Sequence, residues 1–217
     1  MTDFGSLINI YKPKELANYL RRECQKAGWG PTAINVAIAI IVTSVASAVV
    51  ALVGTMLSGV LGAMGGDLGG AAIGGAFNFV LIAATAVASF IGFFVVGLIL
   101  HFIAAALGGK GTPEKTLYMM SLPMLALSPL YAVITLLSVI PCVGCLLIPV
   151  GLLVAIYQLF VYYKGLMAVN GMESTKAIIA LVAWVILLLI LYAIVFGLMF
   201  ALGVVGGMGA GMLGSNF

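Results

Sequence analysis

Hydrophobic residues in this chain fall into five long stretches, separated by short segments that hold nearly all of the polar character. The apolar stretches cover about 33–57, 80–107, 117–139, 146–163 and 177–203. A helix rises 1.5 Å per residue, so about 20 apolar residues cross the hydrocarbon core of a bilayer. The pattern predicts an all-α, polytopic integral membrane protein with five transmembrane helices.

Basic residues have a one-sided distribution along this pattern. All nine Lys and Arg residues lie in the first thirty residues or in two connectors, 108–116 and 164–176. Connectors rich in Lys and Arg remain on the cytoplasmic side of a membrane. We therefore expect the N-terminus to be cytoplasmic and the C-terminus outside, in the cell membrane or, in a eukaryote, in an endomembrane.

Composition narrows the range of functions. The chain is 64% hydrophobic and 7% charged, which leaves too little polar surface for a water-soluble protein. The net charge of +3 reflects the basic connectors, and the absence of a basic run argues against a nucleic-acid partner. No nucleophile, base and orienting group recur at a useful spacing, so we expect no enzyme, no cofactor and no metal site.

Residues 1–30 hold the only segment long enough to form an element outside the bilayer. From Pro13 onward, apolar and basic residues separate onto two sides of a helical wheel, and Glu23 interrupts the apolar side. The apolar side comprises Leu16, Ala17, Tyr19, Leu20, Cys24 and Ala27. This pattern predicts a cytoplasmic amphipathic interfacial helix, with Tyr19 and Trp29 at headgroup depth.

Residues 31–205 form the predicted transmembrane domain, and its first helix has a face of small residues. That face comprises Ser44, Ala48, Ala51, Thr55 and Ser58. Small residues allow close helix packing in lipid, so the face should contact protein, either the chain's own helices or a second copy. We expect the Gly-rich outer connector 59–75, with Asp67, and the Gly/Met-rich tail 206–217 to be flexible.

Polar groups inside the spans are few. His101 and Gln158 are candidates for an intramembrane polar site, although each can equally make a hydrogen bond to a neighbouring helix. Pro123 and Pro129 should kink the third helix, with Ser and Thr hydroxyls available for the freed carbonyls. Together these four residues are the candidate lining of a transporter or channel.

Cys142 and Cys145 have the Cys-x-x-Cys spacing of thiol pairs and lie in the predicted outer turn 141–145. A disulfide and two unpaired thiols both fit this position. Redox relay would need a second outer pair, and zinc would need two further outer ligands. The chain has only one other cysteine, Cys24, on the opposite side.

A set of short motifs in the second half of the chain resembles a known family. The motifs are Gly108 to Tyr118 (GGKGTPEKTLY), His101 before it, and Leu122-Pro123, Ile140-Pro141, Gly144, Val169-Asn170-Gly171-Met172 and Lys176-Ala177 after it. They are similar to the Yip domain of the Ypt/Rab-interacting five-pass membrane proteins. The resemblance implies a role in membrane trafficking or membrane shaping, with Rab GTPases, sister Yip proteins and reticulons as partners. The short N-terminal segment argues against GTPase binding and indicates a prokaryotic relative.

The sequence thus predicts a non-enzymatic membrane protein that organises membrane or binds protein and lipid partners. We expect membrane lipids, sister Yip-like proteins or a second copy as partners, at charged residues of the cytoplasmic side. Those residues are Lys14, Arg21, Arg22, Lys110, Glu114, Lys115 and Lys176. The alternative is a transporter or channel for a small neutral solute or a metal ion.

Overall fold

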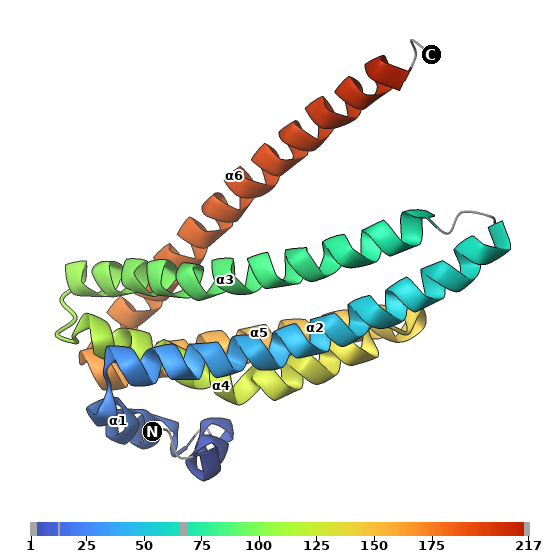
Figure 1. Ribbon diagram of the computed structural model, residues 1–217. Helices are drawn as coiled ribbons and strands as arrows, with labels where there is room; N and C mark the ends of the chain where they lie inside the picture. Colours follow the sequence, from blue (N-terminus) through green and yellow to red (C-terminus); the bar gives the residue numbers. More distant parts are fainter. Residues whose placement is uncertain (1–3, 13, 66–68, 215–217) are drawn as a thin grey trace.

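The computed structural model describes residues 4–12, 14–65 and 69–214, and every regular element among them is a helix (Figure 1). A short N-terminal part precedes five long helices. The elements are η1 (Phe4–Tyr11), α1 (Leu16–Glu23), η2 (Cys24–Lys26), α2 (Trp29–Gly65), α3 (Gly69–Ala106), α4 (Pro113–Leu137), α5 (Pro141–Asn170) and α6 (Ser174–Gly214), where η denotes a 3₁₀ helix.

Each of the five long helices contains a span that is long and apolar enough to cross a membrane, which confirms the prediction of a five-helix, all-α membrane protein. The spans are Trp29–Met56, Asn78–Ala106, Pro113–Leu137, Val143–Asn170 and Ser174–Ile194. Their mean hydropathies range from 1.8 to 3.0, and the lowest belongs to α4.

Three predicted boundaries are wrong or shifted. The connector 59–75 is mostly helical, because α2 continues to Gly65 and α3 begins at Gly69; Asp67 lies outside the described residues. The outer turn was predicted at 141–145, but Pro141 is already the first residue of α5, so the turn precedes it. A backbone near lipid satisfies its own hydrogen bonds best as a helix, which favours such extensions even through Gly-rich sequence. Helix α6 likewise continues to Gly214, into the predicted tail.

Helix α4 occupies the centre of the bundle. It packs against α2, α3 and α5, and 44% of its span is buried, against 17% or less in the other four spans. The buried part is its first half, from Thr116 to Ser128. Helix α6 packs on α3 and α5 near its start and then leans away from the other helices (Figure 1). The least apolar helix is therefore the one shielded most from lipid.

The two prolines of α4 do not end the helix. Pro129 has no N–H to donate to the carbonyl of Leu125, and the Ser128 hydroxyl donates to that oxygen at 2.8 Å. Ser121 donates in the same way to the Tyr118 carbonyl at 2.8 Å, next to Pro123. The expectation that hydroxyls compensate for the prolines is thus confirmed at Pro129, where the bond reaches the freed carbonyl itself.

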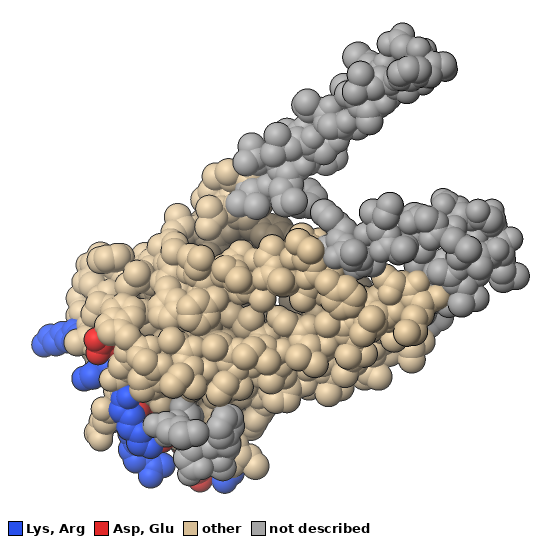
Figure 2. All heavy atoms as spheres, viewed as in Figure 1, with Lys and Arg blue, Asp and Glu red and all other residues tan. Residues whose placement is uncertain are grey.

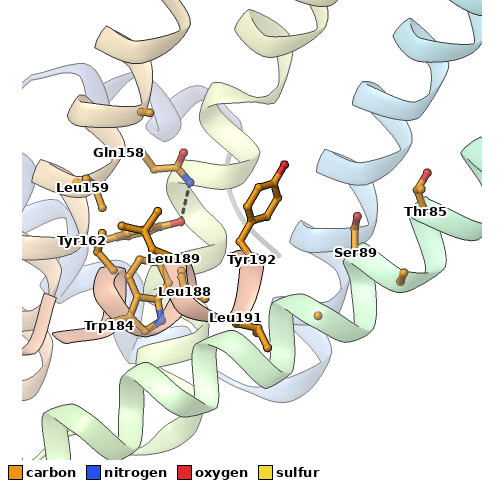
Figure 3. A pocket seen from close by; sticks show the side chains of 14 residues that line it. Thr85, Ser89, Gln158, Leu159, Tyr162, Trp184, Leu188, Leu189, Leu191 and Tyr192 are labelled. Atoms are coloured by element: carbon orange, nitrogen blue, oxygen red, sulfur yellow. Dashed lines mark hydrogen bonds between the residues drawn. The ribbon is translucent and has the colours of Figure 1, made fainter. Parts of the chain in front are cut away.

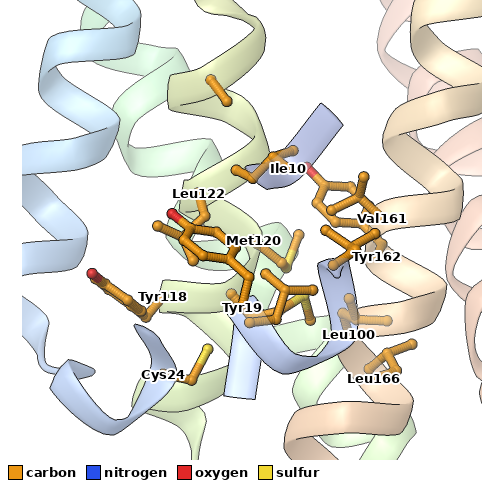
Figure 4. Packing of buried hydrophobic residues seen from close by; sticks show 14 of the residues in the cluster. Ile10, Tyr19, Cys24, Leu100, Tyr118, Met120, Leu122, Val161, Tyr162 and Leu166 are labelled. Atoms are coloured by element: carbon orange, nitrogen blue, oxygen red, sulfur yellow. The ribbon is translucent and has the colours of Figure 1, made fainter. Parts of the chain in front are cut away.

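The N-terminal segment packs on protein, which corrects the prediction of a helix lying in the lipid interface. Its polar side is exposed as expected, but Tyr19 is only 1% exposed and Ile10 is fully buried. They belong to a cluster formed with α4 and α5 (Figure 4). The Tyr11 hydroxyl donates to the Ala126 carbonyl at 2.6 Å, and Tyr157 of α5 donates to the Ile10 carbonyl. Residues 7–12 and 14–24 are therefore part of the folded bundle.

The small-residue face of α2 lies on the protein side of that helix. Ser44, Ala48, Ala51 and Thr55 are half-buried, while Val45 and Met56 on the other side are 59% and 69% exposed. Helix α2 packs against α3 and α4. The side chain of Ser58 lies outside the described residues. The four described positions pack within this chain, and a role of the face in joining two copies stays a prediction.

Candidate functional site

The basic side chains gather at one end of the bundle, which we call the charged end (Figure 2). It contains α1 and η2, the connectors 107–112 and 171–173, and the adjoining turns of the long helices. The predicted contact residues lie here, and all are exposed except half-buried Glu114. They are Lys14, Arg21, Arg22, Lys110, Glu114, Lys115 and Lys176.

Most cations of the charged end have no acidic partner. Three ion pairs occur among the described residues, each between side chains three positions apart. They are Lys12–Glu15, Lys26–Glu23 and Lys176–Glu173. Within the described residues, no ion pair holds Lys14, Arg21, Arg22, Lys110 or Lys115. Exposed cations without acidic neighbours keep their full charge for an external anion.

A buried polar cluster, formed by His101, Thr116 and Asn170, joins the ends of α3, α4 and α5 at the charged end. The Thr116 hydroxyl lies within donor range of the Asn170 Oδ1, at 3.3 Å, and of the Thr112 carbonyl, at 3.2 Å. His101 Nδ1 lies 3.3 Å from the same hydroxyl, within hydrogen-bond distance. The three side chains are 9% exposed or less. The cluster fixes three helix ends relative to one another.

Two glycines allow the connector 107–112 to lie directly on this cluster. A Cβ at Gly111 would lie 1.7 Å from Asn170 Oδ1, and a Cβ at Gly109 would lie 2.8 Å from the Ala104 carbonyl oxygen. The Lys110 N–H donates to the Asn170 carbonyl at 2.9 Å. Gly108, at φ +91°, adopts a left-handed conformation that other residues rarely take. These contacts require the Gly-Gly-Lys-Gly order and hold Lys110 at the surface.

The residues after that connector start α4. The Thr112 side chain accepts from the Lys115 N–H at 3.4 Å, and Pro113 occupies the first helical position. Glu114 follows in the first turn, where a carboxylate interacts favourably with the helix dipole. At the facing end of α5, Gly171 provides a left-handed C-cap at φ +63°. The sequence motifs thus encode the geometry of the charged end.

Gln158 lies elsewhere, on a cavity inside the predicted membrane region. The cavity, of about 1040 Å³, is bounded by α3, α5 and α6 (Figure 3). Gln158 accepts from Tyr131 of α4 at 3.2 Å and donates to Tyr162 at 2.6 Å. Trp184 of α6 donates to the Val96 carbonyl at 3.0 Å. A smaller cavity of about 260 Å³ lies between α2, α3 and α4, lined by hydroxyls such as those of Ser44 and Ser89.

The structure separates residues that the sequence grouped as one lining. Gln158 borders the large cavity, whereas His101 belongs to the buried polar cluster at the charged end. Pro123 is buried in α4, Pro129 is exposed, and neither borders a described cavity. The four candidates therefore do not form a common site.

The cysteines fall at opposite ends of the bundle. Cys145 is exposed near the start of α5, and the side chain of Cys142 lies outside the described residues, so a disulfide between them stays a prediction. Cys24 is buried, and burial raises the pKa of its thiol to about 12. Glu23 raises that pKa further and Lys115 opposes it. Among the described residues, no three His, Cys, Asp or Glu side chains converge as a metal site.

Sequence reasoning did not identify the buried polar cluster. Thr116 and Asn170 appeared only within motifs of the family resemblance, and their 54-residue separation gave no sign of contact. The signal lay in the motifs themselves, because Gly108–Thr112 and Asn170-Gly171 are turn sequences that flank the same end of adjacent helices. Tyr131, Tyr162 and Trp184 were missed because aromatic residues in apolar stretches look the same whether they face lipid or a cavity.

Comparison with protein families gives one result. A family model described as the Yip1 domain matches residues 8–197, which includes the N-terminal segment, the polar cluster and all five spans. Comparison with curated proteins and with solved structures gives no match.

Proposed function

The chain belongs to the Yip1 domain family, and on that premise we propose that it is a non-enzymatic protein that organises membrane by binding partners at its charged end. The charged end faces the cytoplasm in this proposal, as the positive-inside rule favours. The partners are membrane lipids and other membrane proteins, including sister Yip-like proteins or a second copy. GTPase binding is not part of the proposal.

The proposal rests on a group of cations that form no ion pair within the described residues and that project from segments packed against the bundle. Lys110 projects from a connector anchored on the buried polar cluster, and Arg21 and Arg22 project from a helix packed on α5. Ordering of the base before binding reduces the entropy cost of association. The described spans offer nothing comparable, because their lipid-facing surfaces are apolar.

Site-specific photo-crosslinking in native membranes tests this proposal. A photoreactive amino acid at Lys14 or Lys110 should give discrete crosslinked products, and the same group at Ile41 or Leu187 serves as the control on a lipid-exposed surface. These controls lie in mid-span and are 60% and 41% exposed. Products confined to the mid-span positions would contradict the assignment of function to the charged end.

Transport of a small neutral solute is the second candidate, and the few polar side chains that border the two mostly apolar intramembrane cavities favour it. Gln158, Thr85 and Ser89 contribute polar atoms there, and Thr85 and Ser89 border both cavities. Purified protein in liposomes should show no solute flux above protein-free liposomes if the first proposal is correct. Saturable flux that Gln158→Leu abolishes would place transport first.

A further inference from the structure

A cleft at the charged end brings together two cations from different elements. It has a volume of about 180 Å³ and lies where α1 and η2 meet the start of α4 and the end of α5. Arg21, Gln25 and Lys115 supply its polar side chains, and Cys24 also borders it. Ala168 and Val169 of α5 complete the lining.

The electrostatics of the cleft favour an anion. Neither Arg21 nor Lys115 forms an ion pair within the described residues. The nearby Glu23 is buried and pairs with Lys26 at 2.9 Å. Cys24 adds no negative charge, because burial keeps its thiol protonated at neutral pH. Two positive charges that border one small cleft attract an anion more strongly than either charge does alone.

The depth of the cleft points to a particular source of that anion. Lys115 is the third residue of its membrane span, and Ala168 and Val169 are among the last residues of theirs. The cleft therefore lies at the boundary between the apolar spans and the aqueous side. Exposed Phe102, at 67%, and Trp29, at 49%, mark the same end of α3 and α2 as apolar, lipid-facing surface. Phospholipid headgroups occupy this depth of a bilayer.

We propose that this cleft binds the headgroup of an anionic phospholipid of the inner leaflet, with Arg21 and Lys115 on the phosphate and Gln25 as a neutral hydrogen-bond donor. A volume of about 180 Å³ equals roughly six water molecules at about 30 Å³ each, which suits a phosphate group and excludes a whole lipid. The acyl chains then lie against the bundle. This inference rests on the proposed cytoplasmic orientation and gives the proposed function a specific lipid partner.

Lipid retention measured by native mass spectrometry tests the proposal. The full chain is purified with added phosphatidylglycerol or phosphatidylcholine, and the bound fraction is compared. The wild type should retain phosphatidylglycerol preferentially, and Arg21→Gln with Lys115→Gln should reduce its retention about tenfold, because charge-assisted hydrogen bonds to phosphate are lost. Glycerol phosphate should compete poorly, since it lacks acyl chains.

Lys12→Gln with Lys164→Gln is the matched control. It also removes two positive charges, and neither residue borders the cleft or is one of the predicted contact residues. This control should change retention less than twofold. Equal losses in both double variants would overturn the proposal in favour of diffuse attraction to the charged end. Equal retention of the two lipids, or full competition by glycerol phosphate, would also overturn it.

A charge-conserving variant separates binding from folding. Arg21→Lys with Lys115→Arg should keep most of the phosphatidylglycerol retention while exchanging the two side chains. Loss of retention in this variant at an unchanged melting temperature would contradict headgroup binding through charge. Photo-crosslinking to protein partners at the charged end tests the proposed function separately. If such crosslinks form while the chain shows no preference for phosphatidylglycerol, only the assignment of the cleft as a lipid site is contradicted.

Discussion

Replacement of Gly111 by Ala tests the packing of the charged end most sharply. The added Cβ would lie 1.7 Å from Asn170 Oδ1 and 2.7 Å from Asn170 Cγ, far inside van der Waals contact. Asn170 is 2% exposed, so its side chain has no free space in which to rotate. The substitution must therefore move either the connector or the amide that bonds to Thr116.

The expected destabilisation has two sources. Displacement of the Asn170 amide breaks its bond with Thr116, worth about 0.5–1.5 kcal/mol, and leaves a buried oxygen unsatisfied, at about 1–3 kcal/mol. We expect a destabilisation of about 2–4 kcal/mol. For a chain of this size, 1 kcal/mol shifts the melting temperature by about 2–4 °C, so the loss should be on the order of 5–15 °C.

Thermal unfolding in detergent measures this effect, with Gly54→Ala as the matched control. A Cβ at Gly54, inside α2, meets no atom within 4 Å. Alanine favours a helix over glycine by up to about 1 kcal/mol, so the control should be neutral or slightly stabilising. Both variants add one methyl group, and only the methyl group at Gly111 would meet packed atoms.

A double variant identifies the colliding side chain. If Asn170 is responsible, Gly111→Ala should cost less than about 1 kcal/mol when Asn170 is already Ala, because the colliding Oδ1 and Cγ atoms are gone. An unchanged melting temperature for Gly111→Ala alone, or full additivity with Asn170→Ala, would refute the proposed packing.

Three further predictions follow from the described contacts. Replacing both Cys142 and Cys145 by Ser should leave membrane insertion and crosslinking unchanged, since the sequence provides no second cysteine pair for a redox relay at their end; loss of crosslinking with normal insertion would support a redox role. Burial raises the pKa of the Cys24 thiol from 9.0 to about 12. Between pH 9 and pH 12 the thiol therefore ionises in the unfolded chain and stays protonated in the folded one, so the free energy of unfolding should fall as the pH rises through this range. Denaturant titrations of Cys24→Ala should show a smaller fall in the free energy of unfolding over this pH range than titrations of the wild type. An identical fall in the two proteins would argue against a buried thiol at this position. Replacing both Ala51 and Thr55 by Leu should overpack the half-buried face of α2, destabilise the monomer by about 1–3 kcal/mol and lower its melting temperature. If the substitution only weakens self-association, measured by crosslinking, that face binds a second copy.

The spans could be predicted from sequence because a membrane imposes a simple length rule. Each apolar stretch exceeded about 20 residues or came close to it, and each became a helix. The helix ends were less predictable. Gly-rich sequence such as 59–65 reads as a loop in water, but a helix is favoured where lipid offers no hydrogen bonds.

The docking of the N-terminal segment could not be predicted from its amphipathic pattern. Lipid and the interior of a membrane protein are equally apolar, so the pattern around Tyr19 fits burial in either. Ile10 and Leu7 precede the predicted helix and gave no periodic signal, yet they are buried against the bundle. Only the tertiary contacts distinguish the two environments.

The polar cluster illustrates a second limit. His101 was recognised as a polar group near a helix end, but its partner Thr116 lies 15 residues away across a connector. Single residues in a sequence do not reveal which helices meet. The left-handed conformations of Gly108 and Gly171, and the close approach of Gly111 to Asn170, emerged only from the fold.

Accessibility labelling tests the orientation on which the functional account depends. In a variant without native cysteines, Lys176→Cys places a single thiol at the charged end, and Cys145, restored alone, places one at the other end. A membrane-impermeant maleimide is applied to sealed cells of a bacterial host, before and after permeabilisation. The account predicts that Cys145 is labelled in sealed cells and that residue 176 is labelled only after permeabilisation. Labelling of residue 176 in sealed cells would place the charged end outside and contradict a cytoplasmic binding surface.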